Sequence, residues 1–228
     1  MAASGGSNIE FSARKPSRTA VLVSRVLLIG MFASLIYLFP PRDHWAMWWA
    51  AGIWCLFSVY WSIAAKNSAE AKSAESSGSR RVHQALLNGG ILLLFLPIPG
   101  LRQAFVPGSL AWILAGLFVE AASFGLAIWA RRHLGGNWSG RIEIKTDHAL
   151  VRTGPYRLLR HPIYTAILGL SVGTALVDGE THALVGLAMN VLAYWRKIRM
   201  EEAKLREAFG PDYDDYSRAT WRLVPGIF

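Results

Sequence analysis

The sequence has one cysteine and lacks the common signatures of soluble enzymes. Cys55 lies inside an apolar run, which excludes an internal disulfide and a thiolate metal cluster and argues against a cysteine nucleophile. The motifs G-x-G-x-x-G, G-x-x-x-x-G-K-[ST], H-E-x-x-H and G-x-S-x-G are absent, so soluble-type dinucleotide, triphosphate, zinc-protease and serine-hydrolase sites lack their motif. The six histidines do not pair at metal-ligand spacing, so the sequence predicts no metal site.

Charged residues are also scarce, and long apolar runs take their place. Only 17% of residues are charged, whereas 53% are hydrophobic and ten are tryptophan, a balance typical of a bilayer protein. Residues 19–39, 45–65, 84–101 and 109–130 form apolar runs that approach or reach the roughly 20 residues needed to cross a hydrocarbon core. The sequence therefore predicts an all-α polytopic membrane protein with four transmembrane helices.

Two shorter apolar pieces follow, at 163–177 and 183–195, separated by a polar turn. Each is short for an independent crossing, so we expect a C-terminal helical hairpin that dips into or just across the bilayer. With this hairpin the chain would cross the membrane five to six times.

The basic residues predict the orientation, because cytoplasmic loops near span ends are enriched in Lys and Arg. All but two of the 24 basic residues, Arg42 and Arg102, fall on one side of the predicted spans. We therefore expect both termini to be cytoplasmic, in the plasma or inner membrane or, in a eukaryote, the endoplasmic reticulum. This one-sided distribution and attraction to membrane lipids explain the net charge of +9 without a nucleic-acid partner.

Composition distinguishes a polar tail and a polar loop from the rest of the chain, which we expect to form a single domain. Residues 1–17 are rich in Ser and Gly and predict a disordered tail, and 66–79 form a loop of the same kind. Residues 18–228 are treated as one domain. Pro97 and Pro99 predict a helix end, and the alternating stretch 141–145 predicts a short strand or extended arm.

The segment 154–164 concentrates ionisable and aromatic residues beside a predicted span, where such groups are expensive and indicate function. Pro162 suits the first turn of a helix and disfavours a helical conformation at His161. Arg160, His161 and Tyr164 are thereby predicted to form a functional group at the helix N-terminus. For Arg152 and Arg157 we favour the simpler interpretation of interfacial anchors.

About forty residues later, Glu201 and Glu202 follow Arg196 and Arg199 on a predicted helix. These carboxylates could bind an amino group or ribose hydroxyls, and the arginines could hold a carboxylate. Ordinary surface pairing among Arg199, Glu202 and Arg206 explains the same spacing equally well.

The two motifs in this order, with Phe209-Gly210-x-x-Tyr213 and a terminal Arg222-x-x-Pro225, resemble the isoprenylcysteine carboxyl methyltransferase family and its phospholipid methyltransferase relatives. The resemblance covers the C-terminal third to half. It implies an integral membrane enzyme that uses S-adenosylmethionine and releases S-adenosylhomocysteine. Its cytoplasmic cofactor pocket would come from residues 133–228, and its lipophilic or prenylated substrate would enter from the bilayer.

When the family's motifs are matched to this sequence position by position, the resemblance implies nine cofactor-binding residues: Gly154, Pro155, Tyr156, Arg160, His161, Pro162, Tyr164, Glu201 and Glu202. It gives Arg196, Arg199 and Glu201 as catalytic candidates, with the arginines gripping the acceptor. The carboxylate of an isoprenylcysteine-like acceptor is favoured, while a phospholipid amine or a small isoprenoid stays open. A carboxylate needs no base, whereas an amine would need Glu201, Glu202 or His161 to remove a proton.

Two other functions are compatible with parts of the sequence. An NADPH-dependent membrane sterol or ene reductase shares the Arg-His-Pro-x-Tyr element and an ending like residues 223–228, although this chain has few spans for one. A non-catalytic lipid-binding protein or small transporter would use the basic stripe for headgroups, and Glu120 inside the fourth run would fit transport.

Overall fold

The computed structural model describes residues 44–64, 71–73, 77–135, 144–145 and 150–227, and the single positions Gly30, Ala33 and Tyr37. Its elements in chain order are α2 (His44–Ala64), β1 (Ala71–Ser73), α3 (Ser77–Phe95), α4 (Leu110–Leu134), β2 (Ile144–Lys145), η3 (Gly154–Arg157), α5 (Pro162–Asp178), α6 (Thr181–Phe209) and α7 (Pro211–Ala219). The predicted tail at 1–17 and nearly all of the predicted span at 19–39 lie outside the described residues.

Two of the predicted spans are confirmed as long apolar helices. Within α2 and α4, the segments Trp45–Ala64 and Leu110–Leu134 have mean hydropathies of 1.3 and 1.8. Only 33% and 22% of their apolar windows are buried inside the protein. Most of this apolar surface therefore faces outward, as expected for helices in contact with lipid.

The run at 84–101 behaves differently from the prediction of a third span. Its helix, α3, begins earlier, at Ser77, and ends at Phe95, before the two prolines. The first turns carry Arg80 and Arg81, and among the described helices only α2 and α4 combine the length and composition of a span. The predicted helix end at the prolines is confirmed, because proline removes the backbone donors that would continue the helix.

The predicted C-terminal hairpin is present, but its second arm is longer than expected. The first arm, α5, has 17 residues and ends at Gly179, whose φ of 74° is the left-handed conformation that glycine favours at a helix end. The second arm, α6, continues for 29 residues, about 44 Å, without a break between its apolar and charged parts. Gly210 ends it, and Pro211 starts α7. One helix therefore carries the paired glutamates away from the apolar bundle.

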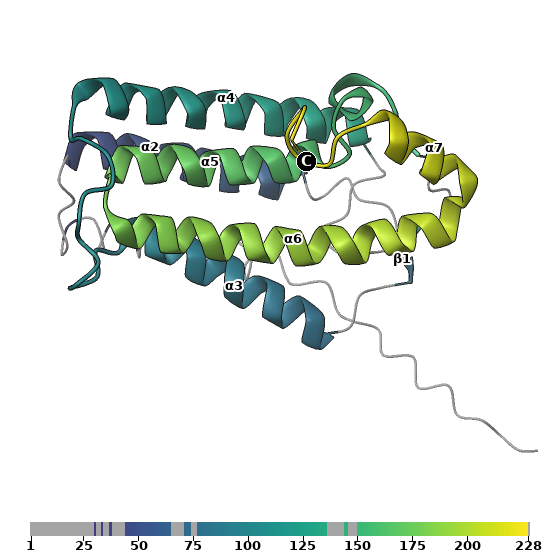
Figure 1. Ribbon diagram of the computed structural model, residues 1–228, viewed down its shortest axis with the longest axis horizontal. Helices are drawn as coiled ribbons and strands as arrows, with labels where there is room; N and C mark the ends of the chain where they lie inside the picture. The colour runs from purple at the N-terminus through teal and green to yellow at the C-terminus, as the bar shows by residue number, and fades with distance from the viewer. Residues whose placement is uncertain are drawn as a thin grey trace, which may run out of the picture.

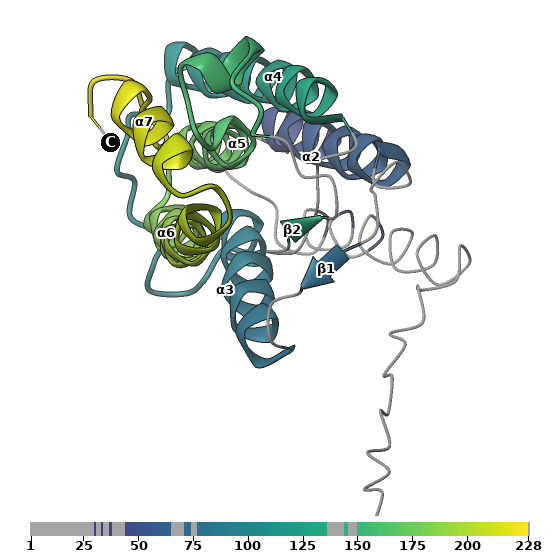
Figure 2. The same cartoon turned by 90° about the vertical axis from the view of Figure 1, so that its right-hand side faces the viewer.

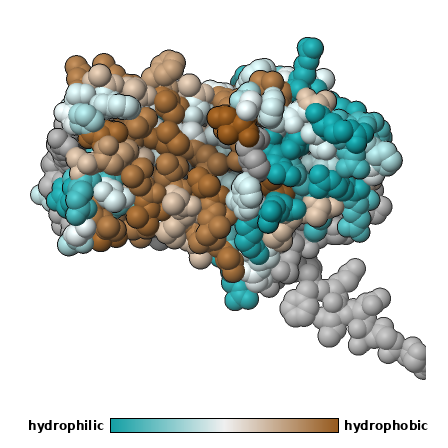
Figure 3. All heavy atoms as spheres, in the orientation of Figure 1, coloured by the Kyte–Doolittle hydropathy of each residue, from teal (hydrophilic) through white to brown (hydrophobic). Residues whose placement is uncertain are grey.

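Helix α5 lies at the centre of the bundle. Figure 2 shows α4 and α2 on one side of it and α6 on the other, with α3 packed along α6. The helices run lengthwise in Figure 1, with the turn between α5 and α6 at one end and α7 at the other. On the face shown in Figure 3, apolar residues cover the helical body and polar residues gather at the end formed by α7.

Helices α4 and α5 contact one another through their backbones. A Cβ atom placed on Gly116 would lie 2.6 Å from the carbonyl oxygen of Gly173, and one placed on Gly173 would lie 2.6 Å from that of Gly116. Gly90 and Gly186 meet in the same way between α3 and α6. Small residues at helix contacts are typical of membrane bundles, where close packing replaces the hydrophobic driving force.

A two-stranded antiparallel ladder joins the connections on either side of α3 and α4. Ala71 pairs with Lys145 and Ser73 with Ile144. The strand predicted near 141–145 is thus confirmed for its last two residues. The expectation of a disordered loop over 66–79 is wrong for Ala71–Ser73 and for residues 77–79, which begin α3, and the described fold is helical with this one small sheet.

The contact between α4 and α5 can be tested with one methyl group. Gly116→Ala places a Cβ against the Gly173 carbonyl and should reduce the free energy of unfolding by about 1–3 kcal/mol, as overpacking does. Gly125→Ala in the same helix meets nothing within 4 Å and should leave stability unchanged or slightly raised. Thermal unfolding in detergent measures both, and equal melting temperatures for the two variants would contradict this packing.

Candidate functional site

The loop before α5 is shaped by a glycine and two prolines. Gly154 has a φ of 57°, and a Cβ there would collide with the imidazole of His133. Pro155 lies in the first turn of the short helix η3, and Pro162 begins α5. His161 stands just before α5 in a non-helical conformation (φ −126°, ψ 56°), as the following proline predicts. The loop therefore places His161 at the mouth of α5.

The C-terminal tail holds this loop through backbone hydrogen bonds. The Arg160 and His161 N–H groups donate to the carbonyls of Trp221 and Arg222 at 2.7 and 3.1 Å, and the Trp221 N–H donates to the Leu158 carbonyl at 3.0 Å. The Arg160 guanidinium also donates to the Ser217 carbonyl at 2.6 Å. The tail thus satisfies backbone polar groups of a partly buried loop, and Leu159 and Trp221 form an isolated parallel β-bridge.

Glu202 is the centre of a buried charge cluster. Its carboxylate accepts hydrogen bonds from Arg160 Nε at 2.9 Å and Arg222 Nε at 3.1 Å, and His161 Nε2 lies 3.4 Å away. The side chain is only 3% exposed. The two sequence motifs therefore meet, as predicted, and Glu202 is bound by groups of the protein itself. The alternative of surface pairing with Arg199 is wrong for Glu202, while Arg206 pairs with Asp214 at 3.2 Å.

Burial alone would raise the pKa of Glu202. The hydrogen bond and charge of His161, together with Arg160, outweigh that effect and lower the pKa to about 2. The carboxylate consequently stays ionised at any physiological pH.

Glu201 has a different hydrogen-bond partner from Glu202. The Tyr164 hydroxyl donates a hydrogen bond to Glu201 Oε2 at 2.6 Å, which links α5 to α6. The Tyr164 ring stacks on His161, with centroids 5.3 Å apart and planes 6° apart. Glu201 remains partly exposed. His161, Tyr164 and Glu201 therefore form one continuous polar and aromatic group.

The structure adds Lys197, which the sequence analysis did not select. Its side chain is buried, and its Nζ lies 5.5 Å from the centre of the Tyr164 ring. The Tyr194 ring lies 4.8 Å from that of Tyr164. Lys197 is four residues before Glu201, a spacing that places both on one helix face and that could have identified it.

The predicted acceptor arginines lie on other faces of α6. Arg196 donates to the Ser79 hydroxyl at 2.7 Å and to the Ser79 carbonyl at 3.2 Å, so it faces α3. Arg199 is exposed and lies 5.3 Å from the Trp195 ring. These contacts separate both arginines from the group formed by Tyr164 and Glu201.

The site can accommodate a ligand that carries both positive and negative groups. The Tyr213 hydroxyl is buried and has no hydrogen-bond partner, whereas His161 Nε2 faces the Glu202 carboxylate at 3.4 Å. The partly exposed Glu201 carboxylate suits a cationic group, and Lys197 suits an anionic one. This combination fits an amino-acid-containing or nucleoside-containing ligand better than a wholly apolar one.

The lowered pKa of Glu202 predicts a loss of stability in acid. Because its folded pKa of about 2 lies below the ordinary value of 4.5, its contribution is complete above pH 4.5 and is lost as the pH falls towards 2. That contribution is on the order of 2–3 kcal/mol. Glu202→Gln should lower the melting temperature at pH 7 and flatten its fall between pH 5 and about 3.

Glu207→Gln is the matched control, since Glu207 is exposed on the same helix. It should reproduce the wild-type curve of melting temperature against pH. A wild-type curve for Glu202→Gln as well would show that the buried cluster does not stabilise the fold.

Comparison with known proteins finds similarity to one methyltransferase family. The model of the isoprenylcysteine carboxyl methyltransferase (ICMT) family matches residues 114–207, which include the charged cluster's Glu202 and the Tyr164–Glu201 pair. Two relatives are isoprenylcysteine O-methyltransferases. That of Dictyostelium discoideum is 33% identical over 86 residues, 37% of this chain and 36% of the relative. Protein-S-isoprenylcysteine O-methyltransferase A of Arabidopsis thaliana is 32% identical over 132 residues, 57% of this chain and 64% of the relative.

A third relative has a different name: the nickel-cobalt-cadmium resistance protein NccN of Alcaligenes xylosoxydans xylosoxydans is 32% identical over 126 residues, 51% of this chain and 53% of the relative. The chain thus spans between about a third and two thirds of the length of these relatives.

The fold is similar to a solved structure of the eukaryotic intramembrane Ras methyltransferase ICMT. The TM-score is 0.57 at 20% identity, over 91% of this chain and 77% of the other. The family model and these relatives make residues 114–207, with the two motifs that meet at Glu201 and Glu202, similar to the isoprenylcysteine carboxyl methyltransferase family, and the solved structure shows that the fold is shared.

Proposed function

We propose that this protein transfers a methyl group from S-adenosylmethionine to the carboxylate of a lipophilic, isoprenylcysteine-like acceptor at the membrane. The hydrogen bond between Tyr164 and Glu201 carries the proposal, because it joins the two halves of the family motif at the polar end of an apolar bundle. A polar cofactor and a lipophilic acceptor could meet at such a boundary.

The residues around this bond fit the cofactor's chemical groups. S-adenosylmethionine carries an ammonium, a sulfonium, a carboxylate and ribose hydroxyls. In our proposal Glu201 binds a positive or hydroxyl group, the Tyr213 hydroxyl takes a hydrogen bond that the protein does not supply, and the His161 ring, stacked on Tyr164, borders the cofactor. The loop of Gly154, Pro155 and Tyr156 would enclose the cofactor, as the family resemblance implies.

We propose different roles for Glu202 and Glu201. Its carboxylate already accepts bonds from Arg160 and Arg222, so it fixes the loop that carries His161. We therefore assign Arg160 and Glu202 to positioning of the cofactor loop, and Glu201 to contact with the cofactor.

When bound, S-adenosylmethionine supplies an electrophilic methyl group on a sulfonium. The chain's task is then to align the acceptor and to exclude water, since a carboxylate is nucleophilic without a general base. Lys197 is buried beside Tyr164 and is well placed to attract an acceptor carboxylate. We propose it for this role ahead of Arg196 and Arg199, which contact Ser79 and Trp195.

Cofactor binding tests the proposed class of enzyme. Calorimetric titration of the detergent-purified protein with S-adenosylhomocysteine should show one site per chain. Glu201→Gln and His161→Ala should weaken binding at least about tenfold, equivalent to about 1.4 kcal/mol, and Glu207→Gln should leave it unchanged. All variants should remain folded by thermal unfolding.

The same titration with NADPH separates the alternative of a membrane reductase. Binding of NADPH without S-adenosylhomocysteine would move the assignment to a reductase. Binding of neither ligand by the folded protein would favour a non-catalytic lipid-binding role.

The acceptor can be identified by the chemistry of the product. With methyl-labelled cofactor and an S-farnesylated N-acetylcysteine, we expect a labelled methyl ester that base hydrolyses to volatile methanol; N-acetylcysteine without the prenyl group should give none. Lys197→Met should raise the KM for the prenylated acceptor about tenfold while S-adenosylhomocysteine binding is retained. A base-stable methyl group formed on a phosphatidylethanolamine instead would show that the acceptor is an amine.

A further inference from the structure

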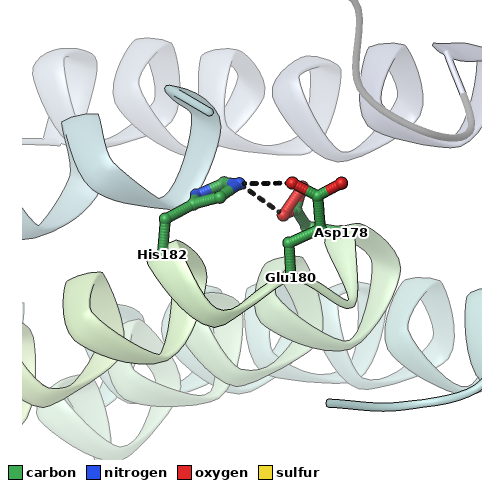
Figure 4. Close-up of side chains that lie close together, drawn as sticks. All are labelled: Asp178, Glu180 and His182. Carbon is green, nitrogen blue, oxygen red and sulfur yellow. Dashed lines mark ion pairs between the residues drawn. The ribbon is translucent and has the colours of Figure 1, made fainter. Parts of the chain in front are cut away.

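Three ionisable side chains meet at the end of α5 opposite the candidate functional site. Asp178 is the last residue of α5, Glu180 precedes α6, and His182 lies in the first turn of α6. Their side chains are 3%, 8% and 1% exposed. Figure 4 shows the imidazole of His182 directed at both carboxylates. The 17 residues of α5 span about 25 Å, so this cluster is separate from the site at the other end.

A proline elsewhere in the chain fixes the tautomer of His182. His182 Nδ1 lies 2.8 Å from the backbone carbonyl oxygen of Leu93. In a longer α3, that carbonyl would accept from the residue four positions later, which is Pro97 and has no N–H. The carbonyl is therefore left for His182, and because it can only accept, Nδ1 carries a proton.

The other ring nitrogen then faces two acceptors. His182 Nε2 lies 3.1 Å from Asp178 Oδ2 and 3.4 Å from Glu180 Oε2. Neither His182 Nε2 nor Asp178 Oδ2 takes part in a hydrogen bond, although both are buried. Three electron-rich atoms this close to one another need a positive charge between them.

The spacing matches that of ligands around a tetrahedral transition metal. Zinc bonds to histidine nitrogen and carboxylate oxygen of about 2.0–2.2 Å at tetrahedral angles place neighbouring ligand atoms about 3.3–3.6 Å apart. The two distances from His182 Nε2, 3.1 and 3.4 Å, lie close to this value, and all three ligand atoms lie within 4.8 Å of one another. A ligand histidine usually donates its second N–H to a carbonyl or carboxylate, as His182 does to Leu93.

Backbone bonds hold the three ligands in place. The connection between α3 and α4 lies against the turn, where the Thr181 and His182 N–H groups donate to the carbonyls of Gln103 and Leu101 at 3.0 and 2.9 Å. Arg102 donates to both oxygens of Glu180, at 2.9 and 3.1 Å, and so orients that carboxylate. The site is thus assembled from three segments before any ion binds.

We propose that Asp178, Glu180 and His182 bind one divalent transition-metal ion through nitrogen and oxygen, with Zn²⁺ as the representative ion. The ion would fix the turn of the hairpin, to which α3 and its connection to α4 are hydrogen-bonded, and would stabilise the bundle at the end away from the charged site. The sequence analysis missed this site because it searched for paired histidines, whereas the spacing here is Asp-x-Glu-x-His.

The test uses the full-length protein, free of a polyhistidine tag, stripped with EDTA and then supplied with Zn²⁺. At a Zn²⁺ concentration about 100-fold above Kd, we expect the melting temperature to rise by about 5–10 °C. Co²⁺ should bind with one ion per chain and give the visible absorption of a low-coordinate site. Asp178→Asn and His182→Gln should abolish both signals, while Asp215→Asn, an exposed carboxylate on α7, should retain them.

Two results would overturn the proposal. If Zn²⁺ and Co²⁺ produce no signal in the wild-type protein, the positive charge in the cluster is a proton on His182 held between the two carboxylates. If the signals persist in folded Asp178→Asn and His182→Gln proteins, the metal binds elsewhere on the chain. Because S-adenosylhomocysteine titration of the stripped protein reports on the opposite end, failure of the metal site and of the proposed methyltransferase function are distinguishable.

Discussion

The buried carboxylate of Glu202 is the constraint on which the arrangement of this protein's polar end depends. An ionised group at 3% exposure is costly unless it is paired and hydrogen-bonded, and here Arg160, Arg222 and His161 all lie within 3.4 Å of its oxygens. These partners come from the loop before α5 and from the C-terminal tail. One carboxylate on α6 therefore ties both of these segments to that helix. The adjacent Glu201 is left partly exposed and bonded to Tyr164, at the boundary between the apolar bundle and the polar end. A buried, fully paired carboxylate and a partly exposed one thus occupy consecutive positions.

The rest of the bundle gives this polar end a rigid base. Helix α5 lies between α4 and α6, and its backbone touches α4 at Gly116 and Gly173. At its far end, Asp178 meets His182 under the connection from α3. The central helix is therefore held by charged clusters at both ends and by glycine contacts between them. Movement of α5 would disturb Tyr164 and His161 together, so these contacts keep the polar end in place.

Local features of the sequence predicted much of this fold. The apolar run at 109–130 gave α4 nearly to its ends, and the prolines at 97 and 162 marked the end of α3 and the start of α5. The two motifs were predicted to serve one site, and the structure brings Glu202 of the second motif against Arg160 and His161 of the first. The side-chain contacts that depend on tertiary packing could not be predicted from the sequence. Arg196 contacts Ser79 on α3, whereas the next residue, Lys197, lies beside Tyr164. The two side chains point in different directions because one step along a helix rotates a side chain by about 100°. Arg222 lies twenty residues after Glu202, and only the folded tail brings the two together.

The measurement that tests the account most directly is photo-crosslinking of the detergent-solubilised protein with radiolabelled S-adenosylmethionine, followed by mapping of the labelled peptides. We expect label in peptides from the loop around His161 and Tyr164 and from the region of Glu201 to Tyr213, and loss of that label with excess unlabelled S-adenosylhomocysteine. Competable label confined to α2 or α3 would place the cofactor elsewhere and would contradict the assignment of the charged end as the active site.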